Sequence, residues 1–156
     1  MSHAGRAILA ATVADETIYT REALVPFDRI AQMVWVLDVE RGSQWWCNLA
    51  TLPLFGEPTR EAMLARFARG APSETARTRL EALLREVGRG ERLIDRWTMY
   101  PEGREPFVAE CRGSIIRIAD SVGEPARDAL FIEARVLGAD EVDPAERRGI
   151  EALRYL

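Results

Sequence analysis

Residues 33 to 56 constrain the fold of this chain more than any other stretch. They open with an apolar run, Met33–Leu37, whose β-branched and aromatic residues predict a short strand. A charged segment containing glycine follows and indicates a turn, after which Gln44–Cys47 resumes as a second strand. Asn48 then stops the strand, and its side-chain oxygen can cap the next turn. The stretch therefore predicts a strand hairpin that leads into a short helix ending at Gly56.

This order of segments resembles the opening of a PAS domain. In that family an Asn-x-Ala-x-x-x-x-x-Gly run commonly follows the second strand, and it stands here as Asn48, Ala50 and Gly56. The resemblance covers residues 22–138 and implies an α+β fold. Its core would be a PAS-like five-stranded antiparallel sheet, with short helices and one longer helix packed on one face. An N-terminal cap helix over residues 22–32 and a C-terminal signalling helix would flank this core.

The later sequence fits that order. Ser73–Val87 carries leucines at helical spacing and predicts the longer helix. Three strand signals follow at Arg92–Tyr100, Pro106–Ile118 and Asp128–Leu137. Gly113, inside the second of these strands, indicates a bulge or a close backbone approach. The resulting order is two strands, a group of helices and a three-stranded meander.

Both ends of the chain are interpreted as lying outside the core. Residues 1–21 are weakly patterned, and we expect a flexible lead-in there. Residues 139–156 are expected to form a linker and the start of the signalling helix, because the run from Asp143 to Glu146 resembles a capping box with proline at the first helical position. The chain is therefore expected to be the sensor segment of a larger protein. The alternative is a terminal helix that packs on its own domain.

Composition excludes several functional classes. The formal net charge is −4, and the basic residues are scattered arginines with no lysine, which argues against recognition of nucleic-acid phosphates. No apolar run is long enough for a membrane span, and the N-terminus lacks the pattern of a signal peptide. We therefore expect a cytoplasmic protein that binds neither nucleic acid nor membrane.

No catalytic constellation is recognisable. The single histidine, His3, lies in the expected lead-in, and the chain carries no nucleophile elbow, phosphate loop or metal-binding motif. Cys47 and Cys111 lie in predicted strands, where buried thiols acting as small hydrophobes are the preferred interpretation. The sequence therefore predicts a non-enzymatic module without a metal.

The cofactor that the module would carry stays unknown. The resemblance would allow LOV-type flavin photochemistry only with a cysteine after the short helices, and Leu54–Thr59 has none. A haem-binding PAS domain usually presents a histidine from the long helix, and Ser73–Val87 has none. LOV-type flavin chemistry and haem ligation by histidine are therefore not supported.

An aromatic-rich interior supplies the site candidates. Because neighbours on a strand point to opposite faces, Trp45 and Trp46 are expected to diverge, with one directed toward the helices. The candidates for a pocket that would suit a small apolar or aromatic ligand are Trp35, Trp46, Asn48, Leu52, Phe55, Met63, Phe67, Leu80, Leu84, Trp97 and Cys111. The candidates for dimerisation or signalling are Phe27, Ile30, Ile150 and Leu153.

The leading hypothesis is a sensory and dimerisation module of a bacterial signal-transduction protein, forming a homodimer. A ligand or partner would repack the helices and pass the change to a covalently linked output domain, such as a histidine kinase or a cyclic-dinucleotide enzyme. A ligand-free interaction domain that sets the oligomeric state is the alternative. A small cone-shaped α+β enzyme is a further alternative, which would need an acid such as Asp95 or Glu110 in its pocket.

Overall fold

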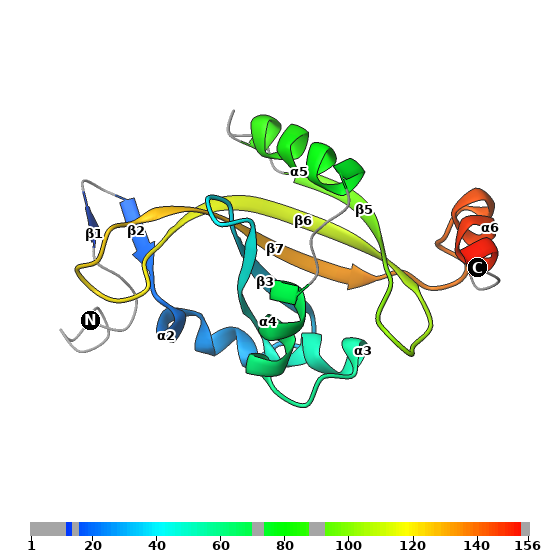
Figure 1. The fold of residues 1–156 in the computed structure, drawn as a ribbon, viewed down its shortest axis with the longest axis horizontal. Helices are drawn as coiled ribbons and strands as arrows, with labels where there is room; N and C mark the ends of the chain where they lie inside the picture. The colour runs from blue at the N-terminus through cyan, green and yellow to red at the C-terminus, as the bar shows by residue number, and fades with distance from the viewer. Residues whose placement is uncertain (1–11, 14–15, 70–73, 88–92, 154–156) are drawn as a thin grey trace.

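The computed structural model describes residues 12–13, 16–69, 74–87 and 93–153. Figure 1 shows the helices gathered around a curled sheet. The elements, in chain order, are β1 (Thr12–Val13), β2 (Glu16–Tyr19), α2 (Arg21–Leu24), the 3₁₀ helix η1 (Val25–Arg29), β3 (Met33–Asp38), β4 (Ser43–Cys47), the 3₁₀ helix η2 (Leu49–Thr51), α3 (Leu52–Phe55), α4 (Arg60–Arg69), α5 (Glu74–Val87), β5 (Leu93–Met99), β6 (Phe107–Ile118), β7 (Arg127–Val136) and α6 (Pro144–Leu153).

The five predicted strands form one antiparallel sheet in the order β4-β3-β7-β6-β5. Strands β6 and β7 are long and pair without interruption from Ala109↔Val136 to Ile118↔Arg127. Gly113 lies within this regular pairing, opposite Ile132 on one side and Leu93 on the other. The expectation of a bulge at Gly113 is therefore wrong.

The expectation of a flexible lead-in over residues 1–21 is wrong for its last part. Strand β2 pairs in parallel with the end of β6, through Ile18↔Arg117 and Tyr19↔Ile118. Ile18 and Thr20 are buried, and the Ala119 amide donates to the Tyr19 carbonyl at 3.0 Å. Such a short parallel pairing leaves little periodicity in the sequence. Residues 1–11 and 14–15 lie outside the described part of the chain.

The predicted cap helix over residues 22–32 is shorter than expected and changes type. Helix α2 ends after one turn, and η1 continues from Val25 to Arg29. Pro26 has no backbone N–H, so it cannot donate the next α-helical hydrogen bond, and the tighter 3₁₀ form follows. The segment still performs the expected covering role, because Leu24 and Phe27 pack against the sheet.

Two apolar clusters lie on opposite faces of the sheet. We call the face that carries Met33, Trp35 and Leu37 the inner face, and the face that carries Val34 and Val36 the outer face. The inner cluster consists of Met33, Trp35, Cys47, Leu52, Phe55, Met63, Ala109, Cys111, Leu130, Ile132 and Ala134. The outer cluster consists of Leu24, Val34, Val36, Trp45, Trp46, Ile118 and Ala129.

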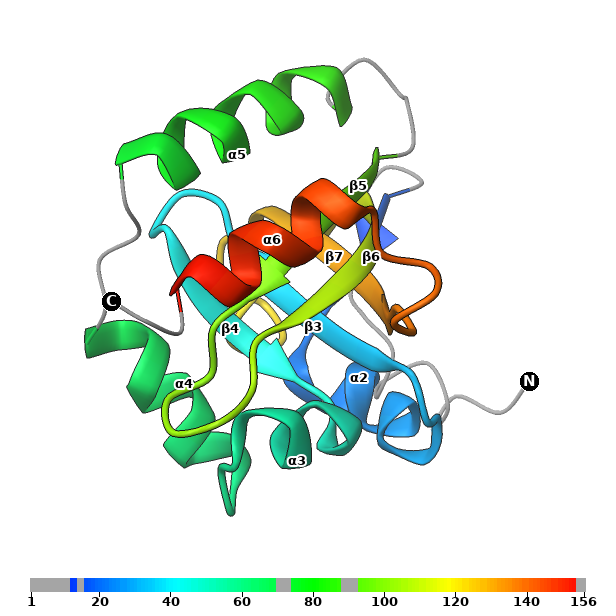
Figure 2. The same ribbon diagram turned by 90° about the vertical axis from the view of Figure 1, so that its right-hand side faces the viewer.

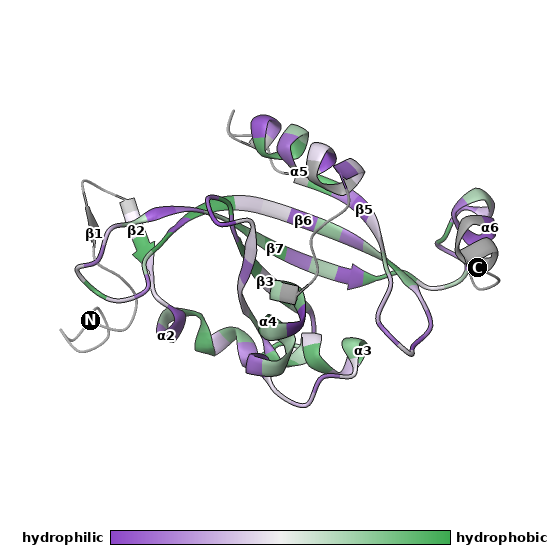
Figure 3. Cartoon of the chain, viewed as in Figure 1, coloured by the Kyte–Doolittle hydropathy of each residue, from purple (hydrophilic) through white to green (hydrophobic). Residues whose placement is uncertain are grey.

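Helices α3, α4 and α5 all contribute side chains to the inner side, as the fold prediction requires. Figure 1 shows α5 on one side of the long β6–β7 pair, and α2, α3 and α4 on the other. Figure 3 shows hydrophobic and hydrophilic positions interleaved along α5, as in a helix with one apolar stripe.

Helix α6 begins with the predicted capping box. The Ala145 amide donates to Asp143 Oδ1 at 2.7 Å, and the Asp143 amide donates to Glu146 Oε2 at 3.0 Å. In Figure 2, α6 lies between the viewer and the strands, with α5 above it. Among the helices of the described residues, none has the length and apolar composition needed to cross a membrane.

Candidate functional site

The inner face of the sheet is an ordered grid of apolar side chains. Strand register places Cys47, Trp35 and Ile132 in one row across β4, β3 and β7, with Gly113 of β6 continuing it. The next row runs through Met33, Ala134 and Cys111 to Asp95 on β5. Because directly paired residues share a face, these rows form a continuous apolar floor below the helices.

Helices α3 and α4 close one part of this floor. Phe55 and Met63 are buried in the inner cluster, and the Phe55 ring meets the Phe107 ring edge-on with centroids 5.8 Å apart. Gly56 ends α3 in the left-handed region, at φ 69°, and a Cβ there would lie 2.5 Å from Arg104 Nε. The positive φ favours glycine at this position, and a Cβ there would require the Arg104 side chain to shift.

Helix α5 closes the other part less completely. Leu83, Leu84 and Trp97 pack against the inner cluster but are only half-buried. Arg79 holds the helix to β5: its Nη2 lies 2.5 Å from Asp95 Oδ2, and its guanidinium carbon lies 4.1 Å from the centre of the Trp97 ring. Among the described side chains of α5, Arg79 holds the helix to β5 through Asp95 and the Arg96 carbonyl, and Leu83 and Leu84 pack on the inner cluster.

Both cysteines lie on the inner face as unreactive thiols. Cys47 and Cys111 are buried and unpaired. Burial raises the pKa of Cys47 to about 11 and the pKa of Cys111 to about 12. Because the thiolate is the nucleophile and the metal ligand, these side chains act as small apolar groups near neutral pH. Within the described part of the chain, no three His, Cys, Asp or Glu side chains are grouped to hold a metal ion.

Solved structures share this arrangement. A PAS domain from a two-component sensor histidine kinase aligns with a TM-score of 0.52 and 12% sequence identity, over 72% of this chain and 90% of that domain. The PAS domain of a Desulfitobacterium hafniense protein gives a TM-score of 0.52 and 16% identity, over 71% of this chain and 97% of its own. This chain has the fold of a PAS domain. No family model and no curated protein sequence matches it.

The PAS fold brings most of the predicted pocket residues together. Trp35, Leu52, Phe55, Met63 and Cys111 belong to the inner cluster, and Leu84 and Trp97 pack at its edge. Phe67 is 42% exposed, and its ring meets the Phe55 ring edge-on with centroids 5.9 Å apart. Leu80 lies on α5, but its side chain is outside the described residues.

The placement of Trp46 in the pocket is wrong. Val36 pairs with Trp46 and Leu37 pairs with Gln44, so Trp45 is an extra residue in β4, a β-bulge. The bulge breaks the alternation of faces, and Trp45 and Trp46 both lie in the outer cluster. The expectation that the two indoles point to opposite faces is wrong for the same reason.

Asn48 neither caps the following helix nor faces a pocket. Its side chain makes no cap hydrogen bond and is fully buried. Oδ1 accepts from the Val34 amide at 2.9 Å and from Thr51 Oγ1 at 2.9 Å, while Nδ2 donates to the carbonyls of Phe27 and Gln32 at 3.0 and 2.8 Å. With all its hydrogen-bonding capacity used, Asn48 joins the N-terminal cap to the sheet.

The cap residues proposed for dimerisation differ in their surroundings. Phe27 is engaged within the chain, since its ring lies 5.2 Å from that of Phe131. Ile30 is 38% exposed and stays a candidate for contact with a partner. Ile150 and Leu153 lie on α6, and their side chains are outside the described residues.

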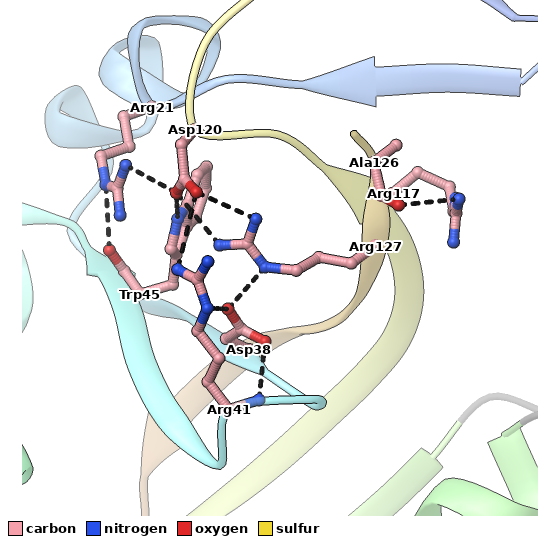
Figure 4. A network of polar contacts seen from close by, with 8 residues as sticks. All are labelled: Arg21, Asp38, Arg41, Trp45, Arg117, Asp120, Ala126 and Arg127. Atoms are coloured by element: carbon pink, nitrogen blue, oxygen red, sulfur yellow. Dashed lines mark hydrogen bonds and ion pairs between the residues drawn. The ribbon is translucent and has the colours of Figure 1, made fainter. Parts of the chain in front are cut away.

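The sequence did not predict an ionic network below the cap (Figure 4). Arg127 donates to Asp38 at 2.7 Å and to Asp120 at 3.0 Å, although Asp38 is 89 residues away in the sequence. The Trp45 indole and Arg21 also donate to Asp120, at 2.9 and 3.3 Å. The hydrogen bond from Arg127, then that from the Trp45 indole, and the positive charges of Arg127 and Arg21 hold the pKa of Asp120 well below its usual range. The network joins α2, β3 and the β6–β7 loop and is structural.

An open surface groove of about 770 Å³ adjoins the inner cluster. It runs between α3 and the β5–β6 hairpin and is lined by Pro53, Leu54, Gly103, Arg104, Glu105, Pro106 and Phe107. Leu54 and Phe107 also pack against the inner cluster, so the groove lies at the rim of the site.

Proposed function

We propose that this chain is a sensory PAS module that binds a small apolar or aromatic ligand on the inner face, below α5, and passes the change to a linked output domain. The observation that carries this proposal is the half-buried rim of the inner cluster below α5, formed by Leu83, Leu84 and Trp97. A ligand that lies there would bury this apolar surface, which favours binding.

The two groups of helices differ in how firmly they are attached. Helix α4 inserts the fully buried Met63, and its first residue, Arg60, donates to the Cys47 carbonyl at 2.7 Å. Helix α5 has half-buried leucines and the partly exposed contact of Arg79 with Asp95. Segments with fewer buried contacts open at a lower free energy, so α5 is the element expected to move when a ligand enters.

Helix α6 provides the route to the output domain. Arg96 of β5 lies 3.8 Å from Glu146, and Arg135 of β7 lies 2.9 Å from Glu141 in the preceding loop. Both arginines belong to strands whose inner side chains face the ligand site. A shift of the β5 edge would therefore reach the start of α6, and from there a histidine kinase or a cyclic-dinucleotide enzyme in the same protein.

A ligand-free interaction module that forms a homodimer is the second candidate. It is favoured by exposed aliphatic side chains on the cap and the adjoining turn, Val25, Ile30 and Leu49. In this alternative the inner cluster would be a filled core, and α5 would not move.

Native and denaturing mass spectrometry of the freshly purified protein separate the two candidates. Our proposal predicts that the native mass exceeds the denatured mass by the mass of a bound small molecule. The absorbance spectrum of the same sample should then contain the bands of that molecule. A bare native mass without added absorbance would contradict the proposal. The same native spectrum reports whether the protein is a dimer.

A further inference from the structure

Strand β5 forms one edge of the sheet. Within the described part of the chain it pairs with β6 and with no other strand. The direction of the backbone groups in β6 follows from one hydrogen bond: the Val108 carbonyl accepts from the amide of Leu137, directly after β7, at 2.9 Å. Because backbone groups alternate in direction along a strand, even-numbered residues of β6 hydrogen-bond toward β7 and odd-numbered ones toward β5.

Half of the backbone groups of β5 therefore point away from the sheet. Asp95 pairs with the odd-numbered Cys111, so the odd-numbered residues of β5 hydrogen-bond toward β6. The even-numbered residues Ile94, Arg96 and Thr98 present their N–H and C=O groups outward. Such an edge is a template for pairing with another strand, and proteins commonly block it.

Helix α5 blocks the middle of this edge. Arg79 Nη2 donates to the Arg96 carbonyl at 2.7 Å, and it also lies 2.5 Å from Asp95 Oδ2. The other oxygen of that carboxylate, Oδ1, accepts from the Arg96 amide at 2.9 Å. Both outward groups of Arg96 are occupied by this pair, which we call the Arg79–Asp95 clasp. Another strand can pair along the whole of β5 only after the clasp has opened.

A second copy of the chain supplies a strand that matches this edge in charge. Like charges directly opposite each other destabilise an antiparallel pair. Two β5 strands centred on Arg96 would oppose two arginines, and two strands centred on Asp95 would oppose two aspartates. Centred on Trp97, they oppose no like charges, and Arg96 of each copy faces Thr98 of the other. Centres nearer either end of β5 pair less of the strand.

The same register brings the exposed apolar side chains of the strand together. Ile94 is 63% exposed and Tyr100, directly after β5, is 54% exposed. Both lie at even-numbered positions and therefore on the outer face, opposite to that of Trp97. With the strands centred on Trp97, Ile94 of each copy faces Tyr100 of the other. Their burial favours the pairing of two copies.

We propose that the outer edge of β5 is a docking edge for a second copy of this chain, and that the Arg79–Asp95 clasp keeps it closed. A movement of α5 withdraws Arg79, and the two β5 strands then join the sheets of both copies into one. This inference rests on the proposed function, which makes α5 the element that moves. It couples the opening of the ligand site to dimerisation.

Arg79→Ala opens the clasp without any ligand and so tests the inference directly. Amide exchange is followed by nuclear magnetic resonance at low and high protein concentration. In Arg79→Ala, the amides of Ile94 and Thr98 should exchange more slowly as the concentration rises, because pairing uses their outward N–H groups. Two clasps open per dimer and each is worth about a factor of five, so the wild type should dimerise about twentyfold more weakly.

Two further variants keep this test specific. Arg85→Ala removes an exposed arginine from the same helix and should behave as the wild type does. Asp95→Ala opens the clasp from the strand and should act in the same direction as Arg79→Ala, so the result does not depend on one variant.

A charge swap at Thr98 tests the register. In the Arg79→Ala background, Thr98→Lys places a lysine opposite Arg96 of the second copy, whereas Thr98→Glu places a glutamate there. Each dimer contains two such pairs, so the Glu variant should dimerise about tenfold more tightly than the Lys variant.

Three results would overturn the inference. Exchange at Ile94 and Thr98 that does not depend on concentration in Arg79→Ala would show that the edge does not dock a second copy. A dimer that leaves these two amides unprotected would use another surface. Equal dimerisation of the wild type and Arg79→Ala, or of the two Thr98 variants, would contradict the clasp or the register. The native mass spectrum decides separately whether a ligand is bound, so the proposed function can stand when this inference fails.

Discussion

Removal of the Asn48 side chain tests the link between the cap and the sheet most sharply. In Asn48→Ala, the Val34 amide would be left buried without an acceptor, at a cost of roughly 2 kcal/mol. The carbonyls of Phe27 and Gln32 would lose their donors, but water can replace these at about 0.5 kcal/mol each. The expected loss is about 3 kcal/mol, a large share of the 5–15 kcal/mol that is typical of a domain.

Urea unfolding followed by tryptophan fluorescence measures this loss, since the free energy of unfolding falls linearly with denaturant. Thr51→Val is the matched control, because it removes one donor to Asn48 Oδ1 and leaves the bond to Val34 in place. It should cost about 1 kcal/mol. A loss in Asn48→Ala no larger than in this control, with unchanged amide exchange over residues 21–32, would refute the reasoning.

Three further predictions concern charged groups and thiols. Arg60 Nη2 of α4 lies 2.5 Å from Asp28 Oδ1 of the cap. A double-mutant cycle with Arg60→Gln and Asp28→Asn, measured by urea unfolding, should therefore give a coupling free energy of about 1–2 kcal/mol. The pKa of Asp120 is lower in the folded than in the unfolded state. Its contribution to stability should therefore be complete above about pH 5 and fall as the pH drops through 4. Thermal unfolding of the wild type and of Asp120→Asn at several pH values measures this contribution. Cys47 and Cys111 should resist a thiol-labelling disulfide at pH 8 until the protein is unfolded.

Each of these has its own control. Arg66 lies on α4 like Arg60, and its Nη1 is 3.3 Å from Glu57 Oε1 in the loop before the helix. Arg66→Gln should leave amide exchange in the cap unchanged, whereas Arg60→Gln should accelerate it. Equal effects of the two variants on the cap would contradict a specific link. If the wild type and Asp120→Asn lost stability in parallel between pH 5 and 3, Asp120 would not cause the acid sensitivity. Rapid labelling of the folded protein would contradict the burial of the thiols.

The sequence predicted the strand order because most strands alternate regularly and pair antiparallel. The Asn48 motif located the start of the helices, and the leucine spacing located α5. Local signals of this kind depend on residues close together in the chain. The strands were therefore placed correctly along the chain, although the faces of the β4 side chains were not.

The features that were missed depend on distant or irregular contacts. The bulge at Trp45 moved Trp46 to the outer face, because alternation predicts faces only where pairing is regular. The bond between Arg127 and Asp38 joins residues 89 positions apart, and neither residue has a local sign of burial. Gln44 looked like an ordinary strand residue, since only its position in the folded sheet shows that its oxygen is buried without a donor.

The crystal structure of the protein, purified directly from cells, tests the central claim most directly. Our account predicts density for a small molecule between α5 and the inner face, in contact with Leu84 and Trp97. An inner face filled by its own side chains, with both residues packed directly on the sheet, would contradict it. So would a molecule bound only in the groove between Pro53 and Phe107.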